Sequence, residues 1–394
     1  MINSLPTSVL KATESVVLYA LAAGLVFFGL SLEKRKRKTL LVPIWALLGK
    51  SFWGVHHLLW IPGLSFQFGM LDIITVFCAP LILNAIDKPL VLCERDTRAR
   101  SLWTGYKLYN NPRMLPVNLP PKENKGSTET NKNLLFFVGC RTLKVAVIFG
   151  LRAALEAAMG VVFGTISITE ISPSREPMIR RLISGQLTSR DLLLRIFTTA
   201  YWLIETVAQL ELGHLLLAVV FVVLLRFDRP EEWPPLFGHP REAYTLRRFW
   251  GRFWHRLLSP SVATWGRVLA DKILGPRDKA TARNLIVALF VFTVSGLAHV
   301  AVNWRLGQPA LDRDILYFWV TFLAISCEVA VTKLWTRMSS RYPFNAGSGQ
   351  TRVFGRILGF VKFVWVFGFL IWLTPRLVYA KTYESIMLKA RVDL

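Results

Sequence analysis

Cysteines and acidic residues are the two kinds of side chain that this 394-residue sequence has little of. It contains 25 Asp and Glu against 48 Lys and Arg, which gives a net charge of +23. The four cysteines are scattered, with none of the short spacings that are typical of metal sites. They are Cys78, Cys93, Cys140 and Cys327. Three of them lie in or beside apolar runs, where a reduced and packed thiol is the simplest interpretation. The sequence therefore predicts no metal site.

Aspartate-rich clusters are also missing, which argues against one class of membrane enzyme. An intramembrane prenyltransferase normally needs two such clusters to hold magnesium and a diphosphate. Asn84 and Asp87 resemble half of one cluster, but position 91 is Val91, and no second cluster follows. Internal repeats, which many transporters show, are not visible either.

Apolar residues, by contrast, gather in runs that are long enough to cross a membrane. Hydrophobic residues make up 53% of the chain, and mean hydropathy is +0.40. A soluble protein would also be about half apolar, so the distribution decides. A run of ~20 apolar residues crosses a ~30 Å hydrocarbon core as a helix. We read eight candidate spans, at about residues 12–32, 40–61, 66–86, 134–164, 192–226, 284–304, 315–335 and 357–379. The sequence predicts an all-α, polytopic transmembrane helical bundle.

Two of these spans are less regular than the others. The second is interrupted by Lys50, His56 and His57, so a re-entrant segment is an alternative to a crossing. The fifth is long for one crossing, and we interpret it as a single tilted helix rather than two short segments. We treat residues 1–394 as a single membrane-embedded domain.

The basic residues cluster between the apolar runs, which is how orientation is encoded in membrane proteins. The cluster Lys34–Lys38 follows the first apolar run, which is typical of a retained signal-anchor helix whose C-terminal end is cytosolic. Alternation of eight spans then places loop 227–283 in the cytosol and loop 165–191 in the lumen. Residues 112–133 mix Pro, Asn, Lys and Glu without periodicity, which predicts a mobile cytosolic connector. We expect a multi-pass protein of the endoplasmic reticulum. An anionic lipid surface or a phosphate-bearing coenzyme explains the positive charge better than nucleic acid does.

One histidine lies where a membrane helix tolerates it least. The run from Asn284 to Trp304 holds His299 and contains no acidic or basic residue. A polar group at bilayer depth costs free energy, so it marks a functional site by default. Ser295 and Asn303 lie four residues before and after it on the same helical face, as candidate substrate-binding residues. Hydrogen bonding between helices is the alternative interpretation of this polar stripe.

A second candidate site is the aromatic and basic segment from Leu246 to Leu258. At 3.6 residues per turn it predicts a helix with an aromatic face and a row of arginines at a spacing of four. The face consists of Phe249, Trp250, Phe253 and Trp254, and the row of Arg248, Arg252 and Arg256, with Arg247 nearby. His255 follows directly. This pattern suits docking of an anionic cofactor, and a helix on the membrane surface whose arginines meet lipid phosphates is the alternative.

The residues from Glu231 to Leu258, EEWPPLFGHPREAYTLRRFWGRFWHRLL, and the later VSGLAH from Val294 to His299 carry a family resemblance. Together they resemble the wax-synthase-like branch of the membrane-bound O-acyltransferase superfamily. They look most like its fungal members, which acylate hydroxyls of terpenoid-type secondary metabolites. The PLFG segment, the FWGRFWH block and a histidine after a Ser-Gly pair carry the match. The motif region covers about 231–304.

This resemblance implies transfer of an acyl group, with acetyl preferred, from acyl-CoA to a hydroxyl of a terpenoid or meroterpenoid in an intramembrane reaction chamber. The near-invariant histidine of the superfamily falls on His299. A second polar position, Asn in many branches, falls on His255. The co-substrate is acetyl-CoA, with no tightly bound cofactor.

The coenzyme phosphates would meet the four arginines and the tryptophans of the aromatic segment. These are Arg247, Arg248, Arg252, Arg256, Trp250 and Trp254. Two other functions stay open. A long-chain wax ester synthase would use the same catalytic residues. A membrane transporter is kept in view by Glu205, Glu211 and His214, which lie inside an apolar run.

Overall fold

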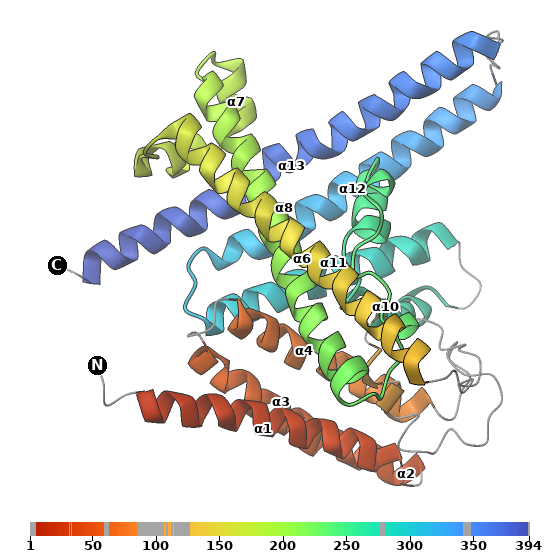
Figure 1. Cartoon of the computed structure of the whole chain (residues 1–394). Coiled ribbons are helices and arrows are strands. Elements are labelled where there is room, and N and C mark those ends of the chain that lie inside the picture. Colours follow the sequence, from red (N-terminus) through yellow and green to blue (C-terminus); the bar gives the residue numbers. More distant parts are fainter. Residues whose placement is uncertain are drawn as a thin grey trace. The chain divides into compact units, whose positions relative to one another are not determined.

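The computed structural model describes residues 5–30, 32, 34–58, 63–85, 106–107, 109–111, 113, 127–275, 280–341 and 348–392. All regular elements in these ranges are helical (Figure 1). The longer ones are α1 (Leu5–Leu30), α3 (Leu41–Gly54), α4 (Leu64–Ala85), α6 (Ser127–Phe163), α8 (Ser189–Ala218), α10 (Ser259–Leu274), α11 (Ala280–Arg305), α12 (Leu311–Arg341) and α13 (Ser348–Val392). The shorter ones are α2 (Lys34–Arg37), α7 (Met178–Ile183), α9 (Leu246–Arg248) and the 3-10 or π turns η2 to η9.

Seven described helical stretches are long and apolar enough to cross a membrane. They are Val9–Leu30, Leu64–Asn84, Leu134–Phe163, Ser189–Leu224, Ala280–Arg305, Leu311–Met338 and Gly359–Arg391. The predicted class, an all-α polytopic membrane protein, is confirmed. The fifth predicted span is one continuous stretch, in which α8 passes directly into the π turn η6 (Val219–Leu224).

The second predicted span, 40–61, differs from the prediction of a full helix and is not among these seven. It consists of α3, with 14 residues, and the 3-10 turn η3 (Val55–Leu58). The α-helix ends where the backbone carbonyl of Trp53 accepts a hydrogen bond from Arg305 Nε (2.5 Å). The break therefore comes from a residue far along the chain.

This broken segment nevertheless runs antiparallel to α1, and the two lie side by side in Figure 1. Lys50 Nζ pairs with Glu14 Oε1 at 2.9 Å. Val55 and Leu58 pack with Ala12. At 1.5 Å per α-helical and 2.0 Å per 3-10 residue, Leu41–Leu58 spans about 29 Å. The segment thus extends about as far as the hydrocarbon core is thick.

The predicted connector 112–133 is shorter than expected, because residues 127–133 already belong to α6. Residues 112 and 114–126 lie outside the described residues. The described contacts divide the chain into two compact units, residues 1–120 with 256–322 and residues 121–255 with 323–394. A single functional domain over 1–394 stays a prediction.

The first unit packs α1, α3, α4, α10 and α11 around one apolar cluster. Its members include Val26, Leu48, Ile74, Val262 and Ala298. Between α1, α3 and α4 lies a polar group at the same depth: the Ser51 hydroxyl is 3.0 Å from the Ser15 carbonyl and 3.1 Å from Asp72 Oδ2. The apolar helices of this unit are therefore also joined by hydrogen bonds.

The second unit is built on the antiparallel pair α6 and α8, which contact each other along their lengths. Two ion pairs connect these helices inside the spans. Lys144 Nζ lies 2.6 Å from Glu211 Oε1, and Arg152 Nε lies 2.5 Å from Glu205 Oε2. Glu211 is 3% exposed. Because an unpaired charge at bilayer depth is costly, these pairs fix the two helices in register.

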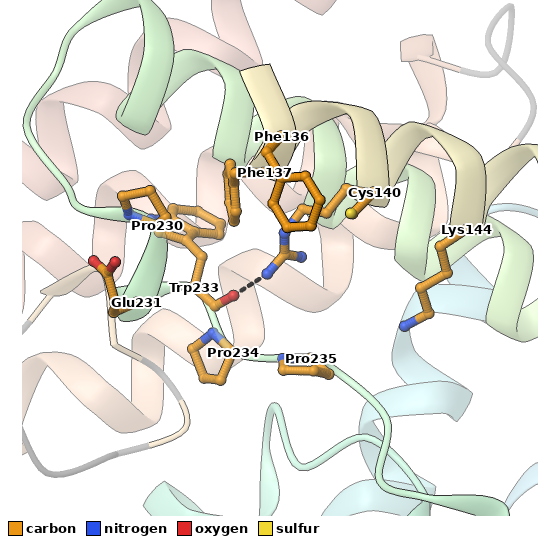
Figure 2. A pocket seen from close by; sticks show the side chains of 10 residues that line it. Phe136, Phe137, Cys140, Lys144, Pro230, Glu231, Trp233, Pro234 and Pro235 are labelled. Carbon is orange, nitrogen blue, oxygen red and sulfur yellow. Dashed lines mark hydrogen bonds between the residues drawn. The ribbon is translucent and has the colours of Figure 1, made fainter. Parts of the chain in front are cut away.

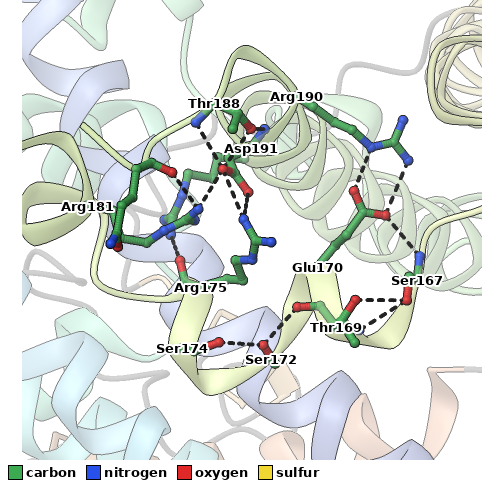
Figure 3. Close-up of polar contacts among 12 residues, drawn as sticks. Ser167, Thr169, Glu170, Ser172, Ser174, Arg175, Arg181, Thr188, Arg190 and Asp191 are labelled. Atoms are coloured by element: carbon green, nitrogen blue, oxygen red, sulfur yellow. Dashed lines mark hydrogen bonds and ion pairs between the residues drawn. The ribbon is translucent and has the colours of Figure 1, made fainter. Parts of the chain in front are cut away.

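A hydrogen-bonded cap closes the α6–α8 end of this unit (Figure 3). Thr188 and Asp191 form a capping box at the start of α8. The Asp191 carboxylate also accepts from Arg175 (3.2 Å) and Arg181 (2.8 Å). Nearby, Arg190 Nε donates to Glu170 Oε1 at 2.6 Å, and this bond lowers the pKa of the Glu170 carboxyl. The cap therefore depends on one nearly buried carboxylate, Asp191.

Replacing Asp191 by Ala should destabilise the protein strongly. Arg181, 8% exposed, would keep its charge and lose a buried partner, which costs about 3–5 kcal/mol. The melting temperature in detergent measures this. Asp271→Ala is the matched control, because the Asp271–Arg283 pair is exposed (44% and 38%) and should contribute about 0–1 kcal/mol. Equal melting temperatures for the two variants would contradict this account of the cap.

Two cysteine reporters can establish the orientation of the motif loop. Gln186 and Arg241 are exposed on opposite sides of the span Ser189–Leu224, so Gln186→Cys and Arg241→Cys should label from opposite faces. If Leu41–Leu58 crosses the membrane, alternation from Lys34–Lys38 places residue 241 in the cytosol. We expect an impermeant maleimide to label Arg241→Cys on sealed microsomes in which the native cysteines are replaced by serine. Labelling of Gln186→Cys instead would mean that Leu41–Leu58 does not cross.

Candidate active site

His299 lies in the first unit, in the middle of the charge-free helix α11. Its ring is half-buried between two aromatic rings, Phe66 of α4 (centroids 5.3 Å apart) and Phe318 of α12 (5.0 Å). One turn earlier, Gly296 brings α11 close to α12: a Cβ there would lie 2.6 Å from Ile315 Cδ1 and 3.3 Å from the Ile315 Cα. Glycine is therefore required for the approach that places Phe318 against the histidine.

The polar stripe around His299 divides into two kinds of residue. Ser295 is half-buried on the same helix. Asn303 is 8% exposed, and its amide donates to Asp314 Oδ2 at 2.9 Å. This bond joins the end of α11 to the start of α12, as the alternative interpretation of the stripe expects. Contacts of Ser295 and Asn303 with a substrate stay predictions.

The aromatic and basic segment lies in the second unit up to residue 255, and the prediction of one helix over 246–258 is wrong. The α-helix α9 has only three residues and passes into a π turn, η9 (Phe249–Phe253). The Trp254 N–H donates to the Phe249 carbonyl, five residues back, at 2.7 Å. Trp254 itself is extended, with φ −69° and ψ 152°. His255 therefore follows the helix rather than belonging to it.

The aromatic face points into the unit instead of toward a lipid surface. Phe249 is fully buried and Trp254 is 5% exposed. Their rings stack at 5.4 Å, and Trp254 also stacks on Trp202 of α8 at 5.8 Å with an interplanar angle of 7°. Trp250 is half-buried against Trp254 at 5.6 Å. These contacts anchor the segment to α8, and binding of a cofactor by Trp250 and Trp254 stays a prediction.

The arginines do not form the continuous row that was predicted. Arg248 pairs with Glu242 and lies over the Tyr244 ring at 4.4 Å, and Arg252, 62% exposed, reaches the same carboxylate at 3.4 Å. Arg256 comes after the end of the helix and Arg247 is exposed. Because η9 changes the helical period, the spacing of four no longer aligns these side chains. Binding of coenzyme phosphates by Arg247, Arg248, Arg252 and Arg256 stays a prediction.

His255 is half-buried next to the PLFG segment. The edge of its ring meets the Phe237 ring at 5.8 Å with an interplanar angle of 83°, and Trp254 lies 5.6 Å away. His255 belongs to the second unit and His299 to the first. Each histidine therefore has an aromatic environment of its own, and their cooperation in one reaction stays a prediction.

Three contacts position this motif segment, and two of them involve residues that the sequence analysis missed. Glu328 of α12 accepts from the backbone N–H groups of Leu246 (2.8 Å) and Arg247 (3.2 Å) at the start of α9. Arg141 of α6 donates to the backbone carbonyl of Trp233. Both charges lie inside predicted spans, and that position is the signal that could have found them.

The third contact is a close backbone approach at Gly238. Its N–H donates to the Phe253 carbonyl at 2.8 Å, and a Cβ on Gly238 would lie only 2.2 Å from the Arg252 carbonyl oxygen. No side chain fits at that distance.

A pocket of about 600 Å³ lies between α6 and the start of the motif segment (Figure 2). Its apolar walls come from Phe136 and Phe137 on one side and from Trp233 and three prolines on the other. Its polar lining residues are Cys140, Arg141, Lys144 and Glu231. Volumes of about 300–1,000 Å³ with few polar groups are usual for small-molecule sites.

Comparison with known proteins assigns the region that holds this geometry. Residues 233–323 match the Membrane bound O-acyl transferase family. The match starts at Trp233, includes both histidines and ends in α12. The chain is thus related to the membrane-bound O-acyltransferases, a class of membrane-embedded acyl-transfer proteins.

Within this class the chain is similar to fungal proteins named acetyltransferases. Acetyltransferase spyB of Aspergillus fumigatus is 36% identical over 127 residues, which are 32% of this chain and 21% of that protein. Acetyltransferase nanB of Aspergillus nanangensis is 34% identical over 164 residues, 41% of this chain and 38% of its own. Acetyltransferase ple2 of Rhodocybe pseudopiperita is 35% identical over 164 residues, 41% and 42% of the two chains. The matches therefore span less than half the length of these relatives. No solved structure matches the chain.

Replacing Gly238 by Ala should disturb the motif segment at one point. The added methyl group forces the backbone at Gly238 and Arg252 apart by roughly 1 Å, a misplacement that can cost about 100-fold in turnover. Gly251→Ala is the matched control, because nothing lies within 4 Å of a Cβ at that position. Acyl transfer per folded molecule measures the difference, and equal activity of both variants would contradict the requirement for close approach.

Proposed function

We propose that the protein is an acyl-CoA-dependent O-acyltransferase that moves an acetyl group to a hydroxyl of a hydrophobic acceptor in the membrane. The observation that supports this most is His299, a half-buried imidazole on an otherwise uncharged membrane helix, inside the matched segment 233–323. Similarity to proteins named acetyltransferases favours acetyl over longer acyl groups.

The proposed reaction needs one proton acceptor near the attacking oxygen. The alcohol oxygen attacks the thioester carbonyl carbon while its proton passes to the imidazole of His299. The tetrahedral intermediate then collapses, the C–S bond breaks, and the thiolate of the coenzyme recovers the proton. Phe66 and Phe318 keep water from the ring and hold it in one orientation. Exclusion of water limits hydrolysis of the thioester.

His255 has a supporting role in this proposal, at the developing oxyanion. A ring N–H can donate a hydrogen bond to that oxygen, which is a large contribution to catalysis in acyl transfer. Arg247, which is exposed, and Arg252, which is 62% exposed, are the arginines of the segment best placed to meet coenzyme phosphates.

A terpenoid-type acceptor and a location in the endoplasmic reticulum complete the proposal. Both rest on the resemblance of the motif region to fungal enzymes of secondary metabolism. The transporter alternative loses its support, because each of its residues has a partner on α6. Glu205 pairs with Arg152, Glu211 with Lys144, and His214 with Arg141.

His299→Ala should abolish most acetyl transfer while the protein still inserts and folds. Loss of a positioned general base costs about 100- to 10,000-fold. The assay compares acetyl-CoA with palmitoyl-CoA over a panel of terpenoid and fatty alcohols in microsomes, with product counted per folded molecule. His255→Asn should keep more activity than His255→Ala, since an amide still donates a hydrogen bond.

His239→Ala is the matched control for these histidine variants. His239 lies on the same motif segment but is exposed, and its Nδ1 accepts from the Arg241 N–H. It should keep its activity. Near wild-type turnover in folded His299→Ala would exclude His299 as the base, and palmitoyl transfer without acetyl transfer would favour a wax ester synthase.

A further inference from the structure

The start of the motif segment is held by Arg141, a cation inside the span Leu134–Phe163. Its guanidinium donates to the backbone carbonyl of Trp233, and Nη1 lies 2.9 Å from Nδ1 of His214 on α8 (Figure 2 shows the first of these bonds). Because arginine can only donate, His214 accepts on Nδ1 and carries its proton on Nε2. One side chain thus joins both helices to the first residue of the matched stretch.

Helix pairing alone does not explain a charge at this position. Arg141 lies seven residues into the span, about 10 Å along the helix, where a cation is costly to insert. The pairs Lys144–Glu211 and Arg152–Glu205 already join α6 to α8. Arg141 differs from both, because it directs one of its donors to the backbone of the motif segment.

Trp233 is fixed on all sides by this arrangement. Its ring lies against His214 at 5.2 Å and stacks on Phe221 at 6.1 Å, and its Nε1 donates to Asp228 Oδ2 at 2.9 Å. It is 8% exposed. The indole packs, while its carbonyl is oriented toward Arg141.

A short and stiff path leads from Trp233 to His255. Two prolines follow Trp233, and their rings restrict the backbone there. Phe237 then contacts the edge of the His255 ring at 5.8 Å. Gly238 donates to the carbonyl of Phe253 at 2.8 Å, two residues before the histidine. A displacement of Trp233 therefore reaches His255 through few rotatable bonds.

We propose that Arg141 is a positioning residue, which holds the Trp233 carbonyl so that the segment from Trp233 to His255 keeps its active geometry. This inference rests on the proposed acetyl transfer. Arg141 touches neither substrate in this role. It acts through the backbone of the motif segment, so its loss should change turnover more than the affinity for acetyl-CoA.

The test compares two arginines of the same helix. Arg141→Met keeps the length and removes the donors, and kcat should fall about 10- to 100-fold with little change in the KM for acetyl-CoA. Arg141→Lys should recover part of the loss, because a charge and a donor remain. Arg152→Met, which breaks the pair with Glu205 and the bond to Tyr201 but leaves the motif segment untouched, should keep a kcat near wild type.

Hydrogen exchange gives a readout that does not require activity. Backbone amides between Gly238 and Trp254 should exchange faster in Arg141→Met than in Arg152→Met. Equal losses of kcat in both variants, or unchanged exchange and kcat in folded Arg141→Met, would overturn the positioning role. A wild-type protein without acetyl transfer would instead overturn the proposed function, and faster exchange in Arg141→Met alone would still support the role of Arg141 in ordering the segment.

Discussion

Polar groups inside the hydrocarbon must find partners within the protein, and this requirement determines how both units are held together. Carbon side chains give the helices little preference for one neighbour over another, since lipid is as apolar as a leucine. The pair Lys144–Glu211 sets the register of α6 against α8. Asn303 and Asp314 do the same between α11 and α12. In each unit the apolar surfaces supply contact area, and a few hydrogen bonds select the arrangement.

The parts of the fold that follow from local composition could be predicted from the sequence. The spans were visible because hydropathy acts over about 20 neighbouring residues. The break after Gly54 was not, because it depends on Arg305, which takes the Trp53 carbonyl from a point 252 residues away. The helix over 246–258 failed for a similar reason: the burial of Phe249 and Trp254 stabilises a π turn, and an aromatic pattern read at 3.6 residues per turn cannot reveal it.

The candidate site shows the same division between local and distant information. His299 could be found, because an isolated imidazole in a charge-free run is conspicuous by itself. Arg141 and Glu328 lie in comparable runs, but their partners are the backbone carbonyl of Trp233 and the backbone N–H groups of Leu246 and Arg247. Backbone groups carry no sequence signature, so the purpose of these charges became clear only with the fold. Gly238 was noticed as part of a motif, while the crowding that demands it was not.

The π turn before His255 has a consequence for how this segment can vary. In η9 the side chains of Phe249 and Trp254, five positions apart, come to lie over one another, whereas in an α-helix residues three or four apart do so. The turn thus contains one residue more than an α-helical turn would hold. Removing any one residue between 249 and 254 would restore the α-helical period and rotate everything after it by about 100°. His255 would then turn away from Phe237. In this segment chain length is therefore constrained as tightly as residue type, and substitutions are tolerated where a deletion is not.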